Sequence, residues 1–176
     1  MVEAAVLSGL FEVLGFLDDG VFQSGQTFGY SVLGNVDSVA SFRGGADCVI
    51  VAIGNNSLRE SITAEVELAQ IEIASVVHPR AFVSPTADVG DVSAIMAGAI
   101  LGPEAKLGKS VIVNAGAVVD HHAQIHDFGH VGVNACMAGG SVLGYAAFMQ
   151  AGAALGYGVV VGAKGNLAPG EAVNRS

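Results

Sequence analysis

Residues 111–143 have the sequence VIVNAGAVVDHHAQIHDFGHVGVNACMAGGSVL, in which an aliphatic residue or methionine recurs at every sixth position. The same spacing continues in both directions without an insertion. The positions are Val77, Val83, Val89, Ile95, Leu101, Leu107, Val113, Val119, Ile125, Val131, Met137, Leu143, Met149, Leu155, Val161, Leu167 and Val173. An α-helix with its period of 3.6 residues would not produce this spacing, and a fixed repeat of this kind indicates a solenoid of short strands.

The neighbours of each aliphatic residue define the repeat. The residue two places earlier is nearly always small, as at Ala99, Ala117 and Ala135. Side chains two apart on a strand point to the same face, so a large and a small residue would fill the interior together. The residue after the aliphatic is often Gly, Asn or Asp, and we expect it to take the corner, where backbone conformations closed to bulky residues are needed. Three strands and three corners would make one triangular coil, which predicts a parallel β-helix.

Composition excludes several classes of protein. The chain is 52% hydrophobic, contains 25 glycines and has a net charge of −9. Such a chain forms a core, and its charge would repel a nucleic acid backbone. Residues 128–163 lack charged residues, but their glycines and six-residue period do not fit a membrane helix, so no membrane partner is expected. Cys48 and Cys136 lack metal-type spacing and are expected to be reduced thiols in a cytoplasmic protein.

Residues 1–76 follow a different pattern. We expect a short helix over 2–10, a strand over 11–17, a parallel strand over 48–53, and a last strand at 76–77. Ser57 could cap a helix over 58–70, with Glu60 completing a capping box. Strand, turn, helix and strand in this order predict a small α/β domain over residues 1–76, followed by the β-helix over 77–176.

Four motifs occur in an order that resembles a known family. They are GFLDDG at 15–20, VIVAIGNNSLR at 49–59, SVVHPRAFVSPTADVG at 75–90 and NAGAVVDHHAQIHDFGHVGVNACMAGG at 114–140. They are similar to bacterial sugar acetyltransferases of the hexapeptide-repeat type, which act on sialic acids or nucleotide-linked amino sugars. The resemblance implies a left-handed β-helix, a Rossmann-like N-terminal domain, acetyl-CoA as co-substrate, no metal, and a homotrimer with active sites between neighbouring β-helices.

The resemblance also implies roles for individual residues. His121 falls at the position of the family's catalytic histidine, which suits a general base at neutral pH. Relatives usually place an acidic residue next, whereas this chain has His122. An imidazole cannot stabilise an imidazolium as a carboxylate does, so Asp120 or Asp127 is a candidate substitute.

Binding residues follow from the same resemblance. His130 matches a position that contacts acetyl-CoA, while Gly139 and Ala151 fall where backbone amides face the thioester and pantetheine. Asn114 matches a position near the acceptor sugar. The ends of two N-terminal strands match the nucleotide-sugar site, at Asp18, Asp19, Gly54 and Asn55. The family's first strand and Gly-rich turn have no counterpart before Met1, so the N-terminal domain is expected to be truncated.

Two other functions are compatible with this fold. A γ-class carbonic anhydrase binds metal between the subunits of a left-handed β-helix trimer, and His121 and His126 have the spacing of two of its ligands. No histidine occupies the place of a third ligand between Val83 and Asn114. A non-catalytic β-helix trimer that serves as a binding module is the second alternative.

Overall fold

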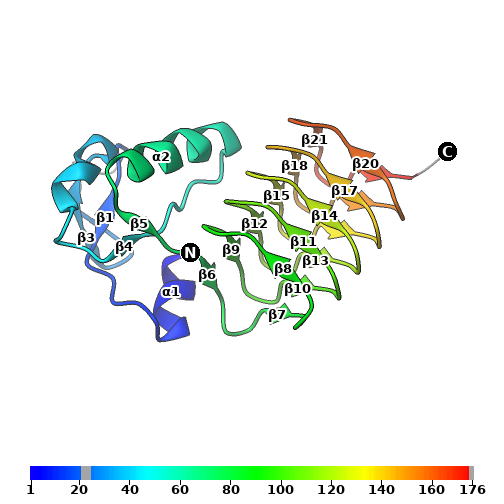
Figure 1. Ribbon diagram of the computed structural model, residues 1–176, viewed down its shortest axis with the longest axis horizontal. Helices are drawn as coiled ribbons and strands as arrows, with labels where there is room; N and C mark the ends of the chain where they lie inside the picture. The colour runs from blue at the N-terminus through cyan, green and yellow to red at the C-terminus, as the bar shows by residue number, and fades with distance from the viewer. Residues whose placement is uncertain (21–24, 175–176) are drawn as a thin grey trace.

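The computed structural model describes residues 1–20 and 25–174, which form an N-terminal α/β domain and a long stack of triangular coils (Figure 1). The N-terminal elements are α1 (Val2–Ser8), β1 (Phe16–Leu17), β2 (Gln26–Thr27), β3 (Tyr30–Gly34), the 3-10 helix η2 (Val36–Phe42), β4 (Cys48–Val49), α2 (Asn56–Leu68) and β5 (Glu72–Ile73). β1 and β4 pair in parallel with β3 and β5 respectively, and β2 joins β3 in antiparallel orientation. The expected small α/β domain is thus present, with strands shorter than predicted.

The coils form three parallel sheets. The first sheet contains β6 (Val76–Val77), β9 (Ala94–Ile95), β12 (Ile112–Val113), β15 (His130–Val131), β18 (Phe148–Met149) and β21 (Asn166–Leu167). The second contains β7 (Phe82–Val83), β10 (Ile100–Leu101), β13 (Val118–Val119), β16 (Cys136–Met137), β19 (Ala154–Leu155) and β22 (Ala172–Val173). The third contains β8 (Asp88–Val89), β11 (Lys106–Leu107), β14 (Gln124–Ile125), β17 (Val142–Leu143) and β20 (Val160–Val161). The predicted left-handed β-helix is confirmed, and Val76–Val77 is its first strand because β6 pairs with β9.

The interior follows the sequence pattern. Leu101, Val119 and Met137 stack in successive coils of the second sheet and are at most 1% exposed. The small residues Ala99, Ala117 and Ala135 lie beside them and are fully buried. Alternating large and small side chains fill the narrow prism, and their removal from water is the main source of its stability.

The corners differ from expectation. The prediction that the Gly, Asn or Asp after each aliphatic has the special conformation is wrong. Positive φ recurs two residues later, at every sixth residue from Val92 to Gly170, including the non-glycine residues Glu104, Ser110 and His122. Gly132 and Gly144 follow aliphatics for another reason. A Cβ there would lie 2.6 Å from the carbonyl oxygen of Met149 and 2.7 Å from the carbonyl carbon of Gly162, in the next coil.

The prism has three edges, and each is a row of corners that joins two of the sheets. The His121 edge joins the second sheet to the third and consists of residues 84–87, 102–105, 120–123, 138–141 and 156–159. The α2 edge joins the third sheet to the first and consists of residues 90–93, 108–111, 126–129, 144–147 and 162–165. The remaining edge, which we call the Asn114 edge, consists of residues 96–99, 114–117, 132–135, 150–153 and 168–171.

The N-terminal domain is fixed to the prism by polar contacts from α2 and apolar contacts from α1. Arg59 is 1% exposed, and its guanidinium donates to the carbonyls of Ser110 (3.0 Å) and Phe128 (2.7 Å) on the α2 edge. The Nδ2 of Asn56 donates to the carbonyl of Ala146 at 2.9 Å. Ala4 and Ala5 of α1 pack on the outer face of the first sheet. Within the described residues, no helix is long and apolar enough to cross a membrane.

Candidate active site

His121 lies on the His121 edge, directly after β13, and half of its side chain is exposed. Its backbone amide donates to the Oδ1 of Asp120 at 2.7 Å. The Oδ2 of Asp120 is 3.9 Å from Nε2 of His121, which is an electrostatic contact rather than a hydrogen bond. The imidazole is therefore held at a corner with one nitrogen open to an incoming group.

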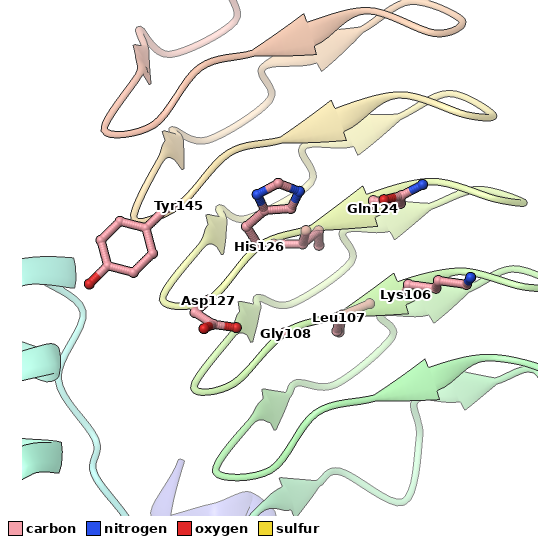
Figure 2. Close-up of a pocket in the computed structure, with 8 residues that line it drawn as sticks. Lys106, Leu107, Gly108, Gln124, His126, Asp127 and Tyr145 are labelled. Carbon is pink, nitrogen blue, oxygen red and sulfur yellow. The ribbon is translucent and has the colours of Figure 1, made fainter.

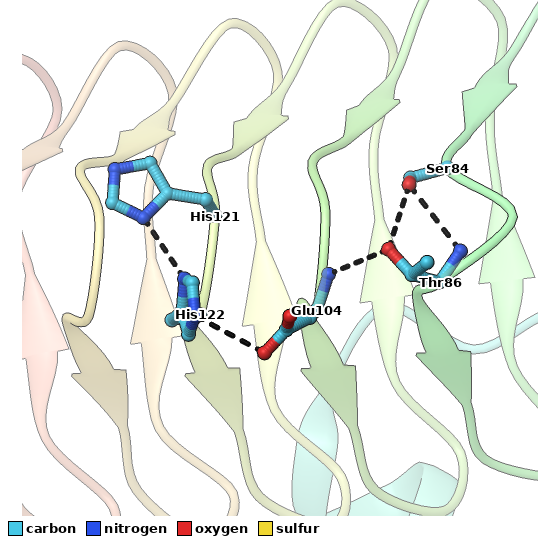
Figure 3. A network of polar contacts seen from close by, with 5 residues as sticks. All are labelled: Ser84, Thr86, Glu104, His121 and His122. Carbon is cyan, nitrogen blue, oxygen red and sulfur yellow. Dashed lines mark hydrogen bonds and ion pairs between the residues drawn. The ribbon is translucent and has the colours of Figure 1, made fainter.

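His122 links His121 to a carboxylate in the preceding coil (Figure 3). The Nδ1 atoms of the two histidines are 3.1 Å apart, and Nε2 of His122 lies 3.1 Å from Oε2 of Glu104. The amide of Glu104 donates to Oγ1 of Thr86 at 3.1 Å, one further coil back. Glu104 was not identified from the sequence, although its place eighteen residues before His122 puts it at the same corner position.

Gly139 lies directly against the ring of His121. A Cβ at this position would be 2.5 Å from Nε2 of His121, so any larger residue would displace the imidazole. Tyr157, in the next coil of the same edge, has its ring centroid 6.5 Å from that of His121. The eighteen-residue stacking explains why these residues, far apart in the sequence, share one site.

Asn114 and Ala151 lie on the Asn114 edge, at the other border of the second sheet, and are not brought to His121 within one chain. The Oδ1 of Asn114 accepts the amide of Ala115 at 2.8 Å. In the part of the chain that the structure describes, the amides of Gly139 and Ala151 donate to no protein acceptor. Both amides are thus available for a ligand.

His130 lies on the outer face of the first sheet and is covered by the N-terminal domain. It is 6% exposed, its Nδ1 is 3.2 Å from the carbonyl oxygen of Gly54, and its ring stacks on Phe148 with centroids 4.5 Å apart. Burial lowers the pKa of His130 to about 4, with a further contribution from the charge of Arg59, although the hydrogen bond to Gly54 acts in the opposite direction. His130 is therefore neutral at pH 7, and its buried Nε2 has no partner among the described residues.

A groove of about 630 Å³ runs between the start of α2 and the first sheet. Its lining includes Gly54, Asn55, His130, Gln150 and Lys164. Two of the predicted nucleotide-sugar residues thus meet the predicted acetyl-CoA residue His130 here, whereas His121 lies on another edge. The groove offers amide, imidazole and ammonium groups to a polar ligand.

Asn55, rather than Ser57, caps α2, because its Oδ1 accepts the amide of Leu58 at 3.0 Å. The predicted capping box is therefore wrong, and Glu60 instead accepts a hydrogen bond from the hydroxyl of Tyr145. This contact raises the pKa of Tyr145 to about 12. Asn55 and Ser57 are both candidates for the capping position, and the earlier one holds it.

Asp18 and Asp19 follow β1 in the N-terminal domain, at the left of Figure 1. Oδ1 of Asp18 accepts the amide of Gly20, and Oδ1 of Asp19 accepts the amide of Val36, both at 2.8 Å. These carboxylates therefore organise the loop at the end of β1. The structure does not bring them to His121 within one chain.

A second hollow, of about 370 Å³, lies on the third sheet and includes Lys106, Gln124, His126, Asp127 and Tyr145 in its lining (Figure 2). Oδ1 of Asp127 accepts the amide of Lys109 at 2.9 Å, which holds the α2 edge. The structure therefore does not bring Asp127, one candidate support, to His121 within one chain.

His126 lies on the α2 edge, after β14, and is thus separated from His121 by a whole strand. Across residues 1–20 and 25–174, no group of three or more His, Cys, Asp or Glu residues could hold a metal ion. The pair His121 and His126 thus forms no common metal site within one chain.

Comparison with known proteins gives matches at the level of domain and structure. Residues 1–66 match the family model of the PglD N-terminal domain. A search of curated proteins finds no match. The crystal structure of PerB from Caulobacter crescentus in complex with CoA and GDP-perosamine is 29% identical, with a TM-score of 0.91, covering 98% of this chain and 81% of that one.

Two further structures are similar. The acetyltransferase domain of PglB from Neisseria gonorrhoeae FA1090, in complex with acetyl coenzyme A, is 29% identical with a TM-score of 0.79, covering 98% and 88% of the two chains. WeeI from Acinetobacter baumannii AYE is 20% identical with a TM-score of 0.66, covering 97% and 87%, and shows the fold alone. The resemblance to hexapeptide-repeat sugar acetyltransferases that the motifs indicated is thereby confirmed.

Proposed function

We propose that this protein transfers an acetyl group from acetyl-CoA to the amine of a nucleotide-linked amino sugar, with His121 as general base. The observation that carries this proposal is the open Nε2 of His121 above Gly139, in a chain that matches PerB, bound to CoA and GDP-perosamine, over 98% of its length. A His-to-Ala mutant of GDP-perosamine N-acetyltransferase from Caulobacter crescentus, in complex with CoA and GDP-perosamine, is also similar, with a TM-score of 0.91. These matches favour N-acetylation over O-acetylation.

The residues around His121 suit direct transfer. The acceptor nitrogen attacks the thioester carbonyl, a carbon–nitrogen bond forms, and the carbon–sulfur bond breaks. Nε2 of His121 takes the proton from the nitrogen and returns it to the departing thiolate. The free amide of Gly139 is placed to stabilise the negative charge on the carbonyl oxygen.

No covalent acyl-enzyme is part of the proposal, because neither cysteine lies beside His121. Cys136 belongs to β16, and Cys48 belongs to β4 in the N-terminal domain. Burial raises the pKa of the Cys48 thiol, helped by the nearby charges of Glu72 and Asp47, and a raised pKa makes the thiol a poorer nucleophile. Both cysteines are unpaired, which supports a cytoplasmic location.

A homotrimer completes the proposal, and the outer face of the second sheet supports it. Phe82, Ile100, Val118, Cys136, Ala154 and Ala172 stack in register along this face. Phe82 is 59% exposed and Ile100 is 42% exposed. The outer face of the first sheet, by contrast, packs against α1 at Val76, Ala94 and Ile112. An uncovered apolar stripe of this kind is typical of an interface.

Three-fold symmetry would also bring the separated site residues together. The second sheet has the His121 edge on one border and the Asn114 edge on the other. If this sheet faces a three-fold axis, the His121 edge of one copy lies beside the Asn114 edge of the next. Asn114 and Ala151 would then face His121 and Gly139 across the cleft between two copies.

The remaining predicted residues are assigned to substrate binding. We propose that His130, Gly54 and Asn55 contact the ligand that binds in the groove beside α2. We propose that Asp18 and Asp19 contact the nucleotide-sugar. A nucleotide-sugar could then be held by the N-terminal domain of one copy while its amine reaches the cleft. Calorimetry with single-residue variants would test each assignment.

The trimer is tested by the mass of the particle in solution. Ile100→Asp should lower the mass by sedimentation from three chains to one, because a buried charge would face the partner. Gln124→Asp on the third sheet is the matched control and should remain trimeric. A trimeric Ile100→Asp would exclude the second sheet as the interface.

The activity is tested by following release of the CoA thiol with a panel of nucleotide-linked amino sugars. We expect release only when the acceptor carries a free amine, and no release with the matching sugar that carries a hydroxyl there. Calorimetry should show binding of acetyl-CoA without an acceptor. Binding of acetyl-CoA with no acetylation of any sugar would indicate a binding module instead.

A further inference from the structure

The His121 edge also carries a carboxylate, in the coil that stacks directly before the coil of His121. Glu104 and His122 are both left-handed corner residues, with φ of 57° and 58°, and they are separated by one coil of eighteen residues. Identical backbone conformations in stacked coils send their side chains out side by side. The approach of Oε2 of Glu104 to within 3.1 Å of Nε2 of His122 follows from this stacking.

A hydrogen bond to the preceding coil fixes the position of Glu104. Its amide donates to Oγ1 of Thr86, which lies 3.1 Å from Oγ of Ser84. The amide of His122 donates to the carbonyl of Pro103 at 3.0 Å. Hydrogen bonds along three successive coils therefore hold Glu104 and His122 in line with His121 (Figure 3).

The positions of the protons along Glu104, His122 and His121 determine which nitrogen of His121 is protonated. The carboxylate of Glu104 lies 3.1 Å from Nε2 of His122, and an ionised carboxylate attracts a protonated nitrogen and repels a lone pair, so Nε2 of His122 carries the proton. Nδ1 of a neutral His122 is then an acceptor, and the partner at 3.1 Å, Nδ1 of His121, must donate. Nε2 of His121 is left with its lone pair, beside Gly139, which is the state that a general base requires.

We propose that Glu104 is a positioning residue that acts through His122, and that the pair replaces the acidic residue which related enzymes place directly after the catalytic histidine. When Nε2 of His121 takes the proton of the acceptor nitrogen, positive charge forms on its ring. The carboxylate of Glu104 stabilises that charge through the polarised ring of His122. This inference rests on the proposed function for its kinetic consequence, but the tautomer of His121 does not depend on it.

Asp120 is the competing carboxylate on this edge. Its Oδ1 accepts the amide of His121, and its Oδ2 is 3.9 Å from Nε2. It therefore lies near the nitrogen that must stay unprotonated and makes no hydrogen bond that would orient the ring. Glu104 is the carboxylate connected to the opposite nitrogen.

The kinetic test is Glu104→Gln. We expect kcat for acetyl transfer to fall about tenfold with KM for both substrates little changed, because the charge acts on the developing imidazolium rather than on binding. Glu65→Gln, which removes an exposed carboxylate of α2, is the matched control and should leave kcat unchanged. Equal rates for the two variants would overturn the role of Glu104.

A rescue variant separates this role from a structural one. His122→Asp in the Glu104→Gln background places a carboxylate directly beside His121, and aspartate tolerates the left-handed backbone at residue 122. We expect most of the lost kcat to return. A double variant no faster than Glu104→Gln would argue that Glu104 acts by another route.

The structural test is nitrogen-15 NMR of the histidine side chains in the full-length protein above pH 7. The wild type should show His121 with the proton on Nδ1, and Glu104→Ala should show a mixture of both tautomers. A wild-type His121 with its proton on Nε2 would overturn the proposal. The proposed function fails if no sugar is acetylated. If the Nδ1 tautomer of His121 is still observed in that case, the link from Glu104 through His122 to His121 remains supported.

Discussion

The His121 edge and the α2 edge have the same backbone and opposite uses. Each places one left-handed residue in every coil. On the α2 edge, the carbonyls of Ser110, Phe128 and Ala146 accept hydrogen bonds from Arg59 and Asn56, so the corner is covered by the N-terminal domain. On the His121 edge, the left-handed residues Glu104 and His122 are exposed, and their side chains form a line that ends at the imidazole of His121. The backbone of a β-helix corner therefore does not by itself determine a function. The residues that cover the corner, or leave it exposed, determine whether it serves docking or catalysis.

The two edges also explain the difference between two histidines. His121 is half exposed, and its Nε2 is open to an incoming group. His130 is covered, and burial lowers its pKa to about 4, so it stays neutral in the same conditions. Only His121 can act as the base, whereas His130 can offer a fixed hydrogen bond.

Arg59→Met should have the largest effect on the covered edge. It removes the donors that satisfy buried carbonyls of Ser110 and Phe128, and we expect a loss of about 4 kcal/mol in the free energy of unfolding. Denaturant unfolding measures it, with Arg80→Met, an exposed arginine, as control. If both variants unfold at the same denaturant concentration, α2 does not depend on Arg59 for docking.

The buried state of His130 predicts an acid-sensitive fold. The unfolded chain binds a proton near pH 6.5, whereas the folded chain does so only near pH 4. Stability is therefore fully present above pH 6.5 and is lost as pH falls to 4, by about 3 kcal/mol. Unfolding of wild type and His130→Gln across this window measures the effect, and the variant should show a flatter dependence. Parallel curves would contradict the buried, neutral His130.

Gly139→Ala should damage the open edge alone. The added Cβ would meet the ring of His121, so we expect kcat to fall about tenfold or more while the unfolding midpoint changes little. Gly162→Ala has no atom within 4 Å of the added Cβ and is the matched control. Wild-type activity in Gly139→Ala would mean that the ring position of His121 is unimportant.

Asn55→Ala should have the smallest effect, about 1 kcal/mol of stability, because it removes the N-cap of α2. Ser57→Ala should cost almost nothing. Thermal unfolding of both variants measures the difference, and the reverse order would restore Ser57 as the cap.

The β-helix could be predicted from the sequence because its interior side chains recur at every sixth residue. Every expected strand position from Val77 to Val173 holds a strand, and the approach of Gly139 to His121 follows from the same stacking. Glu104 could have been found by stepping eighteen residues back from His122. The residue with positive φ was predicted at the wrong position of the corner. Glycine is needed both for positive φ and for close contact between coils, and composition does not distinguish these two needs.

The docking of the N-terminal domain could not be predicted in this way. Arg59 on an otherwise ordinary helix gives no sign that it will be buried against carbonyls 51 and 69 residues later in the chain. Contacts of this kind depend on how two independently folded parts meet. For the same reason the motifs suggested roles for Asn114 and Ala151 without showing how they could reach His121.

The rate of acetyl transfer by His121→Ala tests the account most directly, measured as CoA thiol release with an amino-sugar acceptor. Removing the base should lower kcat about a thousandfold, with mass in solution and unfolding midpoint unchanged. His126→Ala, on the α2 edge of the same coil, should keep wild-type kcat. Turnover by His121→Ala close to that of the wild type would contradict a catalytic His121 edge.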